Sequence, residues 1–111
     1  MSNWQVDVWG LAIGEVQALP DDIRARFRRM AALIESNGLE RMHEPYVKHL
    51  DGKLWEMRLN GRDGIARTLY FAATGRRVIV VRAFVKKTQK TPRSEIALAH
   101  KRMKEWHDEQ R

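Results

Sequence analysis

A group of basic residues in the second half of the chain has few acidic residues near it. The stretch FVKKTQKTP, residues 84–92, contains Lys86, Lys87 and Lys90 but no Asp or Glu. Lysines without acidic neighbours are suited to binding phosphate groups. They are equally suited to a solvated strand end, because lysine discourages the pairing of exposed strand edges. Both interpretations stay open at this point.

Two apolar stretches before this one also contain charged residues. In LWEMRL, Glu56 and Arg58 are two positions apart, so they project from the same face of an extended chain. In IARTLYF, Arg67 lies between apolar residues of its own face. An ion pair of either arginine with Glu56 across a hairpin would explain these charges. Binding of a ligand on a free sheet face would explain them as well.

The composition indicates a partner with negative charge. The 111 residues suit a single domain, 1–111, and 21 Lys and Arg against 14 Asp and Glu give a formal net charge of +7. Such a balance favours contact with nucleic acid, although an acidic membrane surface or an acidic protein would attract the same charge.

Other functional classes are disfavoured by what the sequence lacks. There is no cysteine, which excludes disulfides and the usual zinc clusters, and the four histidines have no recognisable metal-ligand spacing. We therefore expect no metal and no cofactor. The sequence has neither a basic leader with a long apolar run nor a stretch of membrane-spanning length, so we expect a cytoplasmic protein that does not enter the membrane.

The elements that must position the charged residues follow from the spacing of apolar residues. Residues 4–9, WQVDVW, alternate as a short strand. A helical stretch follows and is interrupted by Pro20. From there to Gly38, apolar residues recur at helical spacing, with Asp21 and Asp22 in the first turn. The other face of this helix is expected to be solvated or to face a partner, and it carries Arg24, Arg26, Arg28 and Arg29.

The second half has the two-residue period of strands. Residues 54–71 predict a hairpin around the turn sequence NGRDG, and the apolar run from Arg77 to Val85 predicts a central strand. Thr91 is expected to cap a final helix, with Pro92 at its first position. We predict an α+β domain with a small, mainly antiparallel sheet, N-terminal helices and a C-terminal helix. The helices are expected chiefly on one face, which leaves the other face open to a ligand.

The segment from Lys48 to Arg102 resembles a known family. The motifs LWEMR, GIAR, and FVKKTQKTP before EIALAHKR are together similar to the phage-derived, HigB-like branch of the RelE superfamily of type II toxin–antitoxin toxins. The resemblance implies a compact RelE-like domain that cleaves mRNA in the decoding site of the ribosome. It also implies a cognate antitoxin with a helix-turn-helix DNA-binding domain.

The resemblance assigns roles to the charged residues. Metal-independent RNA cleavage uses the 2'-hydroxyl as nucleophile, so a protein must stabilise charge on the phosphate and transfer protons to and from oxygen. Arg67 resembles the strand arginine that contacts the scissile phosphate, and Arg58 would be a second contact. Lys86 would be an acid or a base, because crowding of positive charges lowers its pKa. Glu56 would be a base or, as we favour, a scaffold that orients Arg58.

Four further residues are expected to contact RNA: Lys87, Lys90, Lys48 and Tyr70. Tyr70 would stack on a base, although strand tyrosines are often packed in a core. The alternative to a toxin is a nucleic-acid-binding or antitoxin-binding regulatory module without catalysis. On an open sheet face, the change Arg67→Ala would abolish cleavage at a modest cost in stability.

Overall fold

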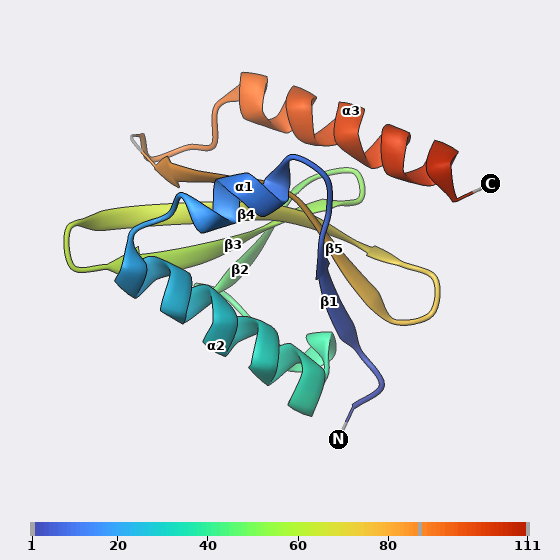
Figure 1. The fold of residues 1–111 in the computed structure, drawn as a ribbon, viewed down its shortest axis with the longest axis horizontal. Coiled ribbons are helices and arrows are strands. Elements are labelled where there is room, and N and C mark those ends of the chain that lie inside the picture. The colour runs from blue at the N-terminus through green and yellow to red at the C-terminus, as the bar shows by residue number, and fades with distance from the viewer. Residues whose placement is uncertain (1, 87, 111) are drawn as a thin grey trace.

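Strands and helices alternate along the chain in the computed structural model, which describes residues 2–86 and 88–110 (Figure 1). The elements in chain order are β1 (Gln5–Val8), α1 (Ala12–Gln17), α2 (Asp21–Asn37), the 3-10 helix η1 (Leu39–Arg41), β2 (Val47–Asp51), β3 (Leu54–Gly61), β4 (Gly64–Ala73), β5 (Arg77–Lys86) and α3 (Arg93–Glu109).

The strands form one sheet in the order β1-β5-β4-β3-β2. Strands β2 to β5 pair with their neighbours in antiparallel fashion, and β1 pairs with β5 in parallel. The hairpin of β3 and β4 closes through Arg62 and Asp63, within the predicted turn sequence NGRDG. The predicted α+β fold with a mainly antiparallel sheet is confirmed.

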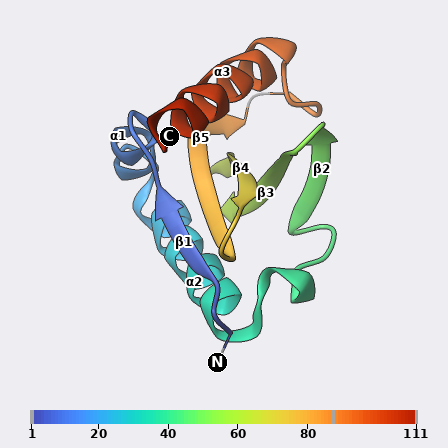
Figure 2. The ribbon, with the colours of Figure 1, turned by 90° about the vertical axis from the view of Figure 1, so that its right-hand side faces the viewer.

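Helices cover both faces of this sheet (Figure 2). On one face, Phe27 and Met30 of α2 pack in a cluster that includes Met57 of β3. On the other face, Ala99 and Trp106 of α3 pack against a second cluster of strand residues. The expectation that helices lie chiefly on one face is therefore wrong. The reason is that β4 and β5 are buried on both faces along most of their length, so each face needs a cover.

The predicted ends of α2 are confirmed, whereas the predicted start of α3 is not. Pro20 precedes α2, and Gly38 ends it with a φ of 91°, which a side chain would disfavour. Helix α3 begins at Arg93, and Pro92 is its N-terminal cap without a side-chain hydrogen bond. The hydroxyl of Thr91 is bound elsewhere, as described below. Within the described ranges, no helix is long and apolar enough to cross a membrane.

Strand β2 was not predicted. Its sequence VKHLD has one fully buried residue, Val47, and it pairs along one edge only, with β3. An edge strand that is mostly exposed has no alternating apolar pattern, so its pairing partner rather than its own sequence makes it a strand.

A network of ion pairs joins α1, β5 and α3 on the α3 side of the sheet. Glu15 of α1 accepts a hydrogen bond from Arg102 of α3 at 2.8 Å, and its other carboxylate oxygen lies 2.9 Å from Arg82 of β5. Arg82 also pairs with Glu95 of α3 at 2.7 Å. Burial by itself would raise the pKa of Glu15. The hydrogen bonds from Arg102 and from a backbone N–H, together with the charge of Arg82, have a larger effect, so the pKa is lowered overall.

Candidate functional site

Four neighbouring strands bring charged side chains to the face of the sheet that α3 covers, close to the residues that precede the N-terminus of that helix. Lys48 of β2 pairs with Glu56 of β3. Arg58 of β3 pairs with Arg67 of β4. Lys86 of β5 lies opposite the residue two positions before Arg67, so it belongs to the same face. Paired residues in a sheet point to one side, and the five side chains therefore form a single group, which we call the charged cluster.

Glu56 is the centre of the charged cluster. Its side chain is 0% exposed. One carboxylate oxygen accepts a hydrogen bond from Nη1 of Arg67 at 3.0 Å, and the other accepts one from Nε of Arg58 at 3.3 Å. The hydroxyl of Thr91 also bonds to Glu56. Both arginines therefore form an ion pair with Glu56, which was one of the two explanations that the sequence left open.

Arg67 is buried, and its terminal nitrogens are bound to protein groups. The side chain is 2% exposed. Besides Glu56, it donates to the hydroxyl of Thr91 and, through Nη2, to the carbonyl of Gln89 at 2.6 Å. Burial lowers the pKa of Arg67, and the charge of Glu56 opposes that change. The expectation that Arg67 faces an open sheet surface is wrong, because the chain between β5 and α3 covers it.

Arg58 is held by the same carboxylate but remains accessible. Its side chain is 33% exposed, and its Nε donates to Glu56. Among the described residues, none accepts a hydrogen bond from its terminal nitrogens. A guanidinium anchored at one edge can present its other edge to a phosphate in a fixed orientation.

Lys86 lies at the end of β5 and is half-buried. Burial lowers its pKa, and the positive charges of Arg67 and Arg58 lower it further, whereas Glu56 acts in the opposite direction. The crowding by like charges that the sequence suggested is therefore present, supplied by arginines of the neighbouring strands.

The other residues expected to bind RNA have different positions. Lys48 is exposed at the border of the charged cluster. Lys90 is exposed in the chain that covers Arg67. Lys87 lies outside the described residues. Tyr70 is 2% exposed in the cluster that packs under α2, and burial raises the pKa of its hydroxyl. The expectation that Tyr70 stacks on a base is wrong. Tyr70 is an odd number of positions from Arg67 on the same strand, so its side chain points to the opposite face of the sheet.

Two residues of this site were not found from the sequence. Gln89 contributes a backbone carbonyl, for which no side-chain signal exists. Thr91 precedes a proline and so has the pattern of a helix cap, but its hydroxyl bonds to Glu56 and Arg67 instead. Within residues 2–86 and 88–110, no three His, Asp or Glu side chains are grouped closely enough to hold a metal ion.

Comparison with known proteins gives a family and a fold. The sequence profile of the family described as "Phage derived protein Gp49-like (DUF891)" matches residues 14–104. A search of curated protein sequences found no match.

Two solved structures have a similar fold. A mutant of the E. coli toxin RelE, with two arginines changed to alanine, in the free state, has a TM-score of 0.65 and 19% identity over 91% of this chain and 98% of that one. A RelE–RelB complex from Pyrococcus horikoshii OT3 has a TM-score of 0.55 and 20% identity over 76% of this chain and 96% of that one. The family match spans most of the chain, and the protein therefore belongs to the phage-derived Gp49-like family, a family of RelE/HigB-like toxins, as its motifs predicted.

Proposed function

We propose that this protein is the toxin of a type II toxin–antitoxin system and that it cleaves mRNA on the ribosome without a metal ion. The observation that carries the proposal is the charged cluster, in which an accessible arginine and a lysine of lowered pKa are held around a buried carboxylate. Metal-independent RNA cleavage needs these two groups: a fixed positive charge for the phosphate and a proton-transfer group.

The geometry favours Arg58 rather than Arg67 as the phosphate contact. The terminal nitrogens of Arg58 have no hydrogen-bond partner among the described residues, while those of Arg67 are bound within the protein. We therefore give Glu56 and Arg67 positioning roles: Arg67 fixes the carboxylate, and the carboxylate fixes Arg58. Lys48 and Lys90 would hold neighbouring phosphates.

Lys86 is the proposed proton donor. In the reaction, the 2'-oxygen attacks phosphorus, a 2',3'-cyclic phosphate forms, and the bond from phosphorus to the 5'-oxygen breaks. The departing 5'-oxygen must receive a proton, and an ammonium group with a lowered pKa gives its proton more readily than an ordinary lysine does. The proton of the 2'-hydroxyl passes to a general base.

The proposed partners are mRNA, the ribosomal decoding site and a cognate antitoxin with a helix-turn-helix domain. The RelE–RelB complex among the similar structures supports a protein partner. Because its targets would be translating ribosomes, the proposed location is the cytoplasm.

The alternative is a nucleic-acid-binding or antitoxin-binding regulatory module without catalysis. The burial of Arg67 favours this alternative. Both of its terminal nitrogens are bound to protein groups, which leaves one arginine fewer for transition-state charge than the sequence suggested.

The experiment is inducible expression in bacteria without an antitoxin, combined with mapping of mRNA ends on programmed ribosomes. We expect growth arrest, loss of translation and new 5'-ends within the ribosome-bound message. Normal growth at verified soluble expression, with intact message on the ribosomes, would support the non-catalytic alternative.

A further inference from the structure

A groove along α2 has no role in the proposed reaction. It has a volume of about 940 Å³ and lies between α2 and the segment that leads from η1 to β2. Its residues on α2 extend from Asp22 to Asn37. A helix rises about 1.5 Å per residue, so these residues span about 22 Å, the length of about four helical turns.

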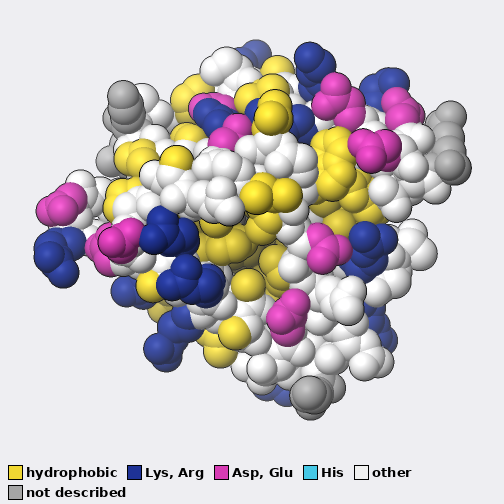
Figure 3. Space-filling view, in the orientation of Figure 1, with side chains coloured by type: hydrophobic (Ala, Val, Ile, Leu, Met, Phe, Trp, Pro, Cys, Tyr) yellow, Lys and Arg dark blue, Asp and Glu magenta, His cyan; other side chains and the backbone are white. Residues whose placement is uncertain are grey.

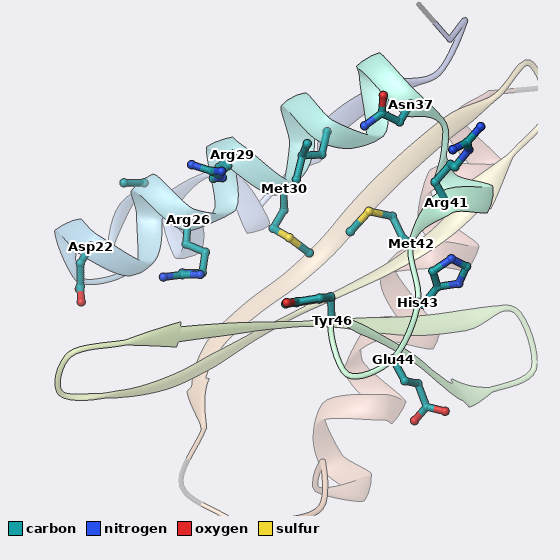
Figure 4. Close-up of a pocket in the computed structure, with 12 residues that line it drawn as sticks. Asp22, Arg26, Arg29, Met30, Asn37, Arg41, Met42, His43, Glu44 and Tyr46 are labelled. Carbon is teal, nitrogen blue, oxygen red and sulfur yellow. The ribbon is translucent and has the colours of Figure 1, made fainter.

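The floor of the groove is apolar. Met30 of α2 and Met42 of the facing segment point towards each other, and Tyr46 lies beside them (Figure 4). Two large apolar side chains lining the groove are well exposed, Tyr46 at 52% and Leu33 at 39%. Apolar surface gathered in a groove indicates a binding surface, and methionine adapts its shape to a partner.

The rim of the groove carries three arginines without an ion-pair partner among the described residues. Glu44 also lines the groove, but its carboxylate points away from the arginines (Figure 4). Arg26 and Arg29 of α2 and Arg41 of η1 line it, and none of them forms an ion pair with a described residue. Asp22, at one end, is already bound to the backbone N–H of Arg62 at 2.6 Å. Figure 3 shows Lys and Arg side chains gathering over the N-terminal half of α2. Carboxylates of a partner would find three available guanidinium groups here.

We propose that this groove docks an amphipathic, acidic helix of the antitoxin, a proposal that rests on the function proposed above. A helix of about 15 residues matches the length of the groove. Its apolar side would pack on the methionine floor, and its Asp and Glu residues would pair with the arginines of the rim. RNA is disfavoured as the occupant, because a phosphate backbone gains little from contact with an apolar floor.

The test is titration of the full-length protein with the product of the reading frame adjacent to its gene, and separately with a 12-nucleotide single-stranded RNA. The variants are Arg29→Glu on the rim and Leu33→Asp on the floor. Their matched controls, Arg28→Glu and Ala32→Asp, change exposed residues of α2 that do not line the groove. Circular dichroism confirms that each variant is folded, and a misfolded one is replaced by Arg26→Glu.

We expect each groove variant to weaken binding of the adjacent gene product by about tenfold or more, and each control by less than about twofold. Leu33→Asp should also stay toxic when the antitoxin is co-expressed. Equal binding by all variants, or no binding by the wild type, would overturn the docking proposal. Loss of RNA affinity alone in Arg29→Glu would make the groove an RNA site. Binding in the groove without growth arrest would instead overturn the toxin function and leave the docking surface standing.

Discussion

At the scale of single residues, the charged cluster depends on one buried carboxylate. Glu56 is fully buried between Arg67 and Arg58, with Thr91 as a further partner. A charge in the interior is expensive unless it is paired and hydrogen-bonded, so Glu56 and Arg67 need each other. The same pairing leaves Arg58 oriented at the surface, where its terminal nitrogens can meet a ligand.

The change Arg67→Ala is expected to destabilise the protein, contrary to the modest cost expected from the sequence. Removing one partner of a buried ion pair typically lowers the free energy of unfolding by about 3–5 kcal/mol, because the other charge stays buried without compensation. Urea denaturation measures this change. Arg58→Ala is the comparison, because Arg58 is partly exposed and its removal leaves Glu56 paired with Arg67, so its loss of stability should be smaller. A loss for Arg67→Ala no larger than that for Arg58→Ala would contradict the burial argument.

The change Arg58→Gln is expected to separate activity from stability. Loss of a preorganised contact to transition-state charge lowers cleavage by about a hundredfold to a thousandfold. Single-turnover cleavage on programmed ribosomes provides the rate, and urea denaturation should show a nearly unchanged midpoint. Arg62→Gln, which alters an exposed arginine in the turn between β3 and β4, is the control and should cleave like the wild type. Full activity of Arg58→Gln would return the phosphate contact to Arg67.

The pKa of Lys86 is expected to rise in the Arg58→Gln variant. Burial would still lower this pKa, but one of the two arginine charges that lower it further would be gone. NMR titration of the protein with ¹³C-methylated lysines measures the pKa in both proteins. If Lys86 is the proton donor, wild-type cleavage should decline as the pH rises through this pKa, and the decline should move to higher pH in the variant. An identical titration in the two proteins would show that Arg58 does not influence Lys86.

At the scale of the elements, α1 and α3 are fixed to the sheet through charge as well as apolar packing. Glu15 accepts a hydrogen bond from Arg102, whose side chain also donates to the carbonyl of Val81 at 2.8 Å. Arg102 is nearly buried, so its charge depends on Glu15 for compensation. This contact keeps α3 on its face of the sheet, next to the chain that covers Arg67.

The change Glu15→Gln is expected to reduce stability at neutral pH by about 2 kcal/mol, the usual contribution of a hydrogen bond to a charged group. The pKa of Glu15 is lowered in the folded protein, so its stabilisation is fully present above the unfolded pKa of 4.5 and is lost as the pH falls through the lower folded value.

Thermal melts between pH 7 and pH 3 test this dependence. The difference in melting temperature between wild type and Glu15→Gln should be largest near neutral pH and should shrink below about pH 4.5. A difference that is constant across this range would mean that Glu15 acts through packing rather than through its charge.

At the scale of the whole molecule, two separate surfaces of this basic chain, which has a net charge of +7, carry groups of Lys or Arg side chains. The charged cluster lies on the face of the sheet that α3 partly covers, and the groove with its arginine rim lies along α2, which covers the other face. We propose RNA as the ligand of the first surface, which consists of charged side chains, and a protein as the ligand of the second, which has an apolar floor. If both proposals hold, the antitoxin helix and RNA would bind to different surfaces of the protein.

Binding of single-stranded RNA is expected to weaken steeply with salt, because each phosphate contact releases condensed counterions. About six contacts on a single strand reduce affinity by roughly three hundredfold between roughly 50 and 200 mM salt. Fluorescence anisotropy with a labelled 12-nucleotide RNA measures the slope. Lys48→Gln should reduce the slope by about 0.7, whereas Lys104→Gln, on the exposed side of α3, should leave it unchanged. A shallow slope for the wild type would argue against RNA as the ligand of the charged cluster.

The sequence by itself determined the elements with strong local patterns and the family. The helix between Pro20 and Gly38, the hairpin around NGRDG and the strand from Arg77 are fixed by apolar period and turn residues, which act over a few positions. The motifs that identified the family are likewise contiguous. The position of Tyr70 could also have been derived, because strand parity alone places it on the face opposite Arg67.

Only the tertiary structure decided which face each helix covers and which arginine stays accessible. Arg67 and Arg58 look equivalent in the sequence, since both are charged residues within apolar strands. Their difference comes from Gln89 and Thr91, which are 22 and 24 positions away from Arg67 and fold over it rather than over Arg58. Burial is a property of such distant contacts, and so are the edge pairing of β2 and the packing of α3 on the second face. Local periodicity contains no information about them, because it reports the conformation of a segment and not what covers it.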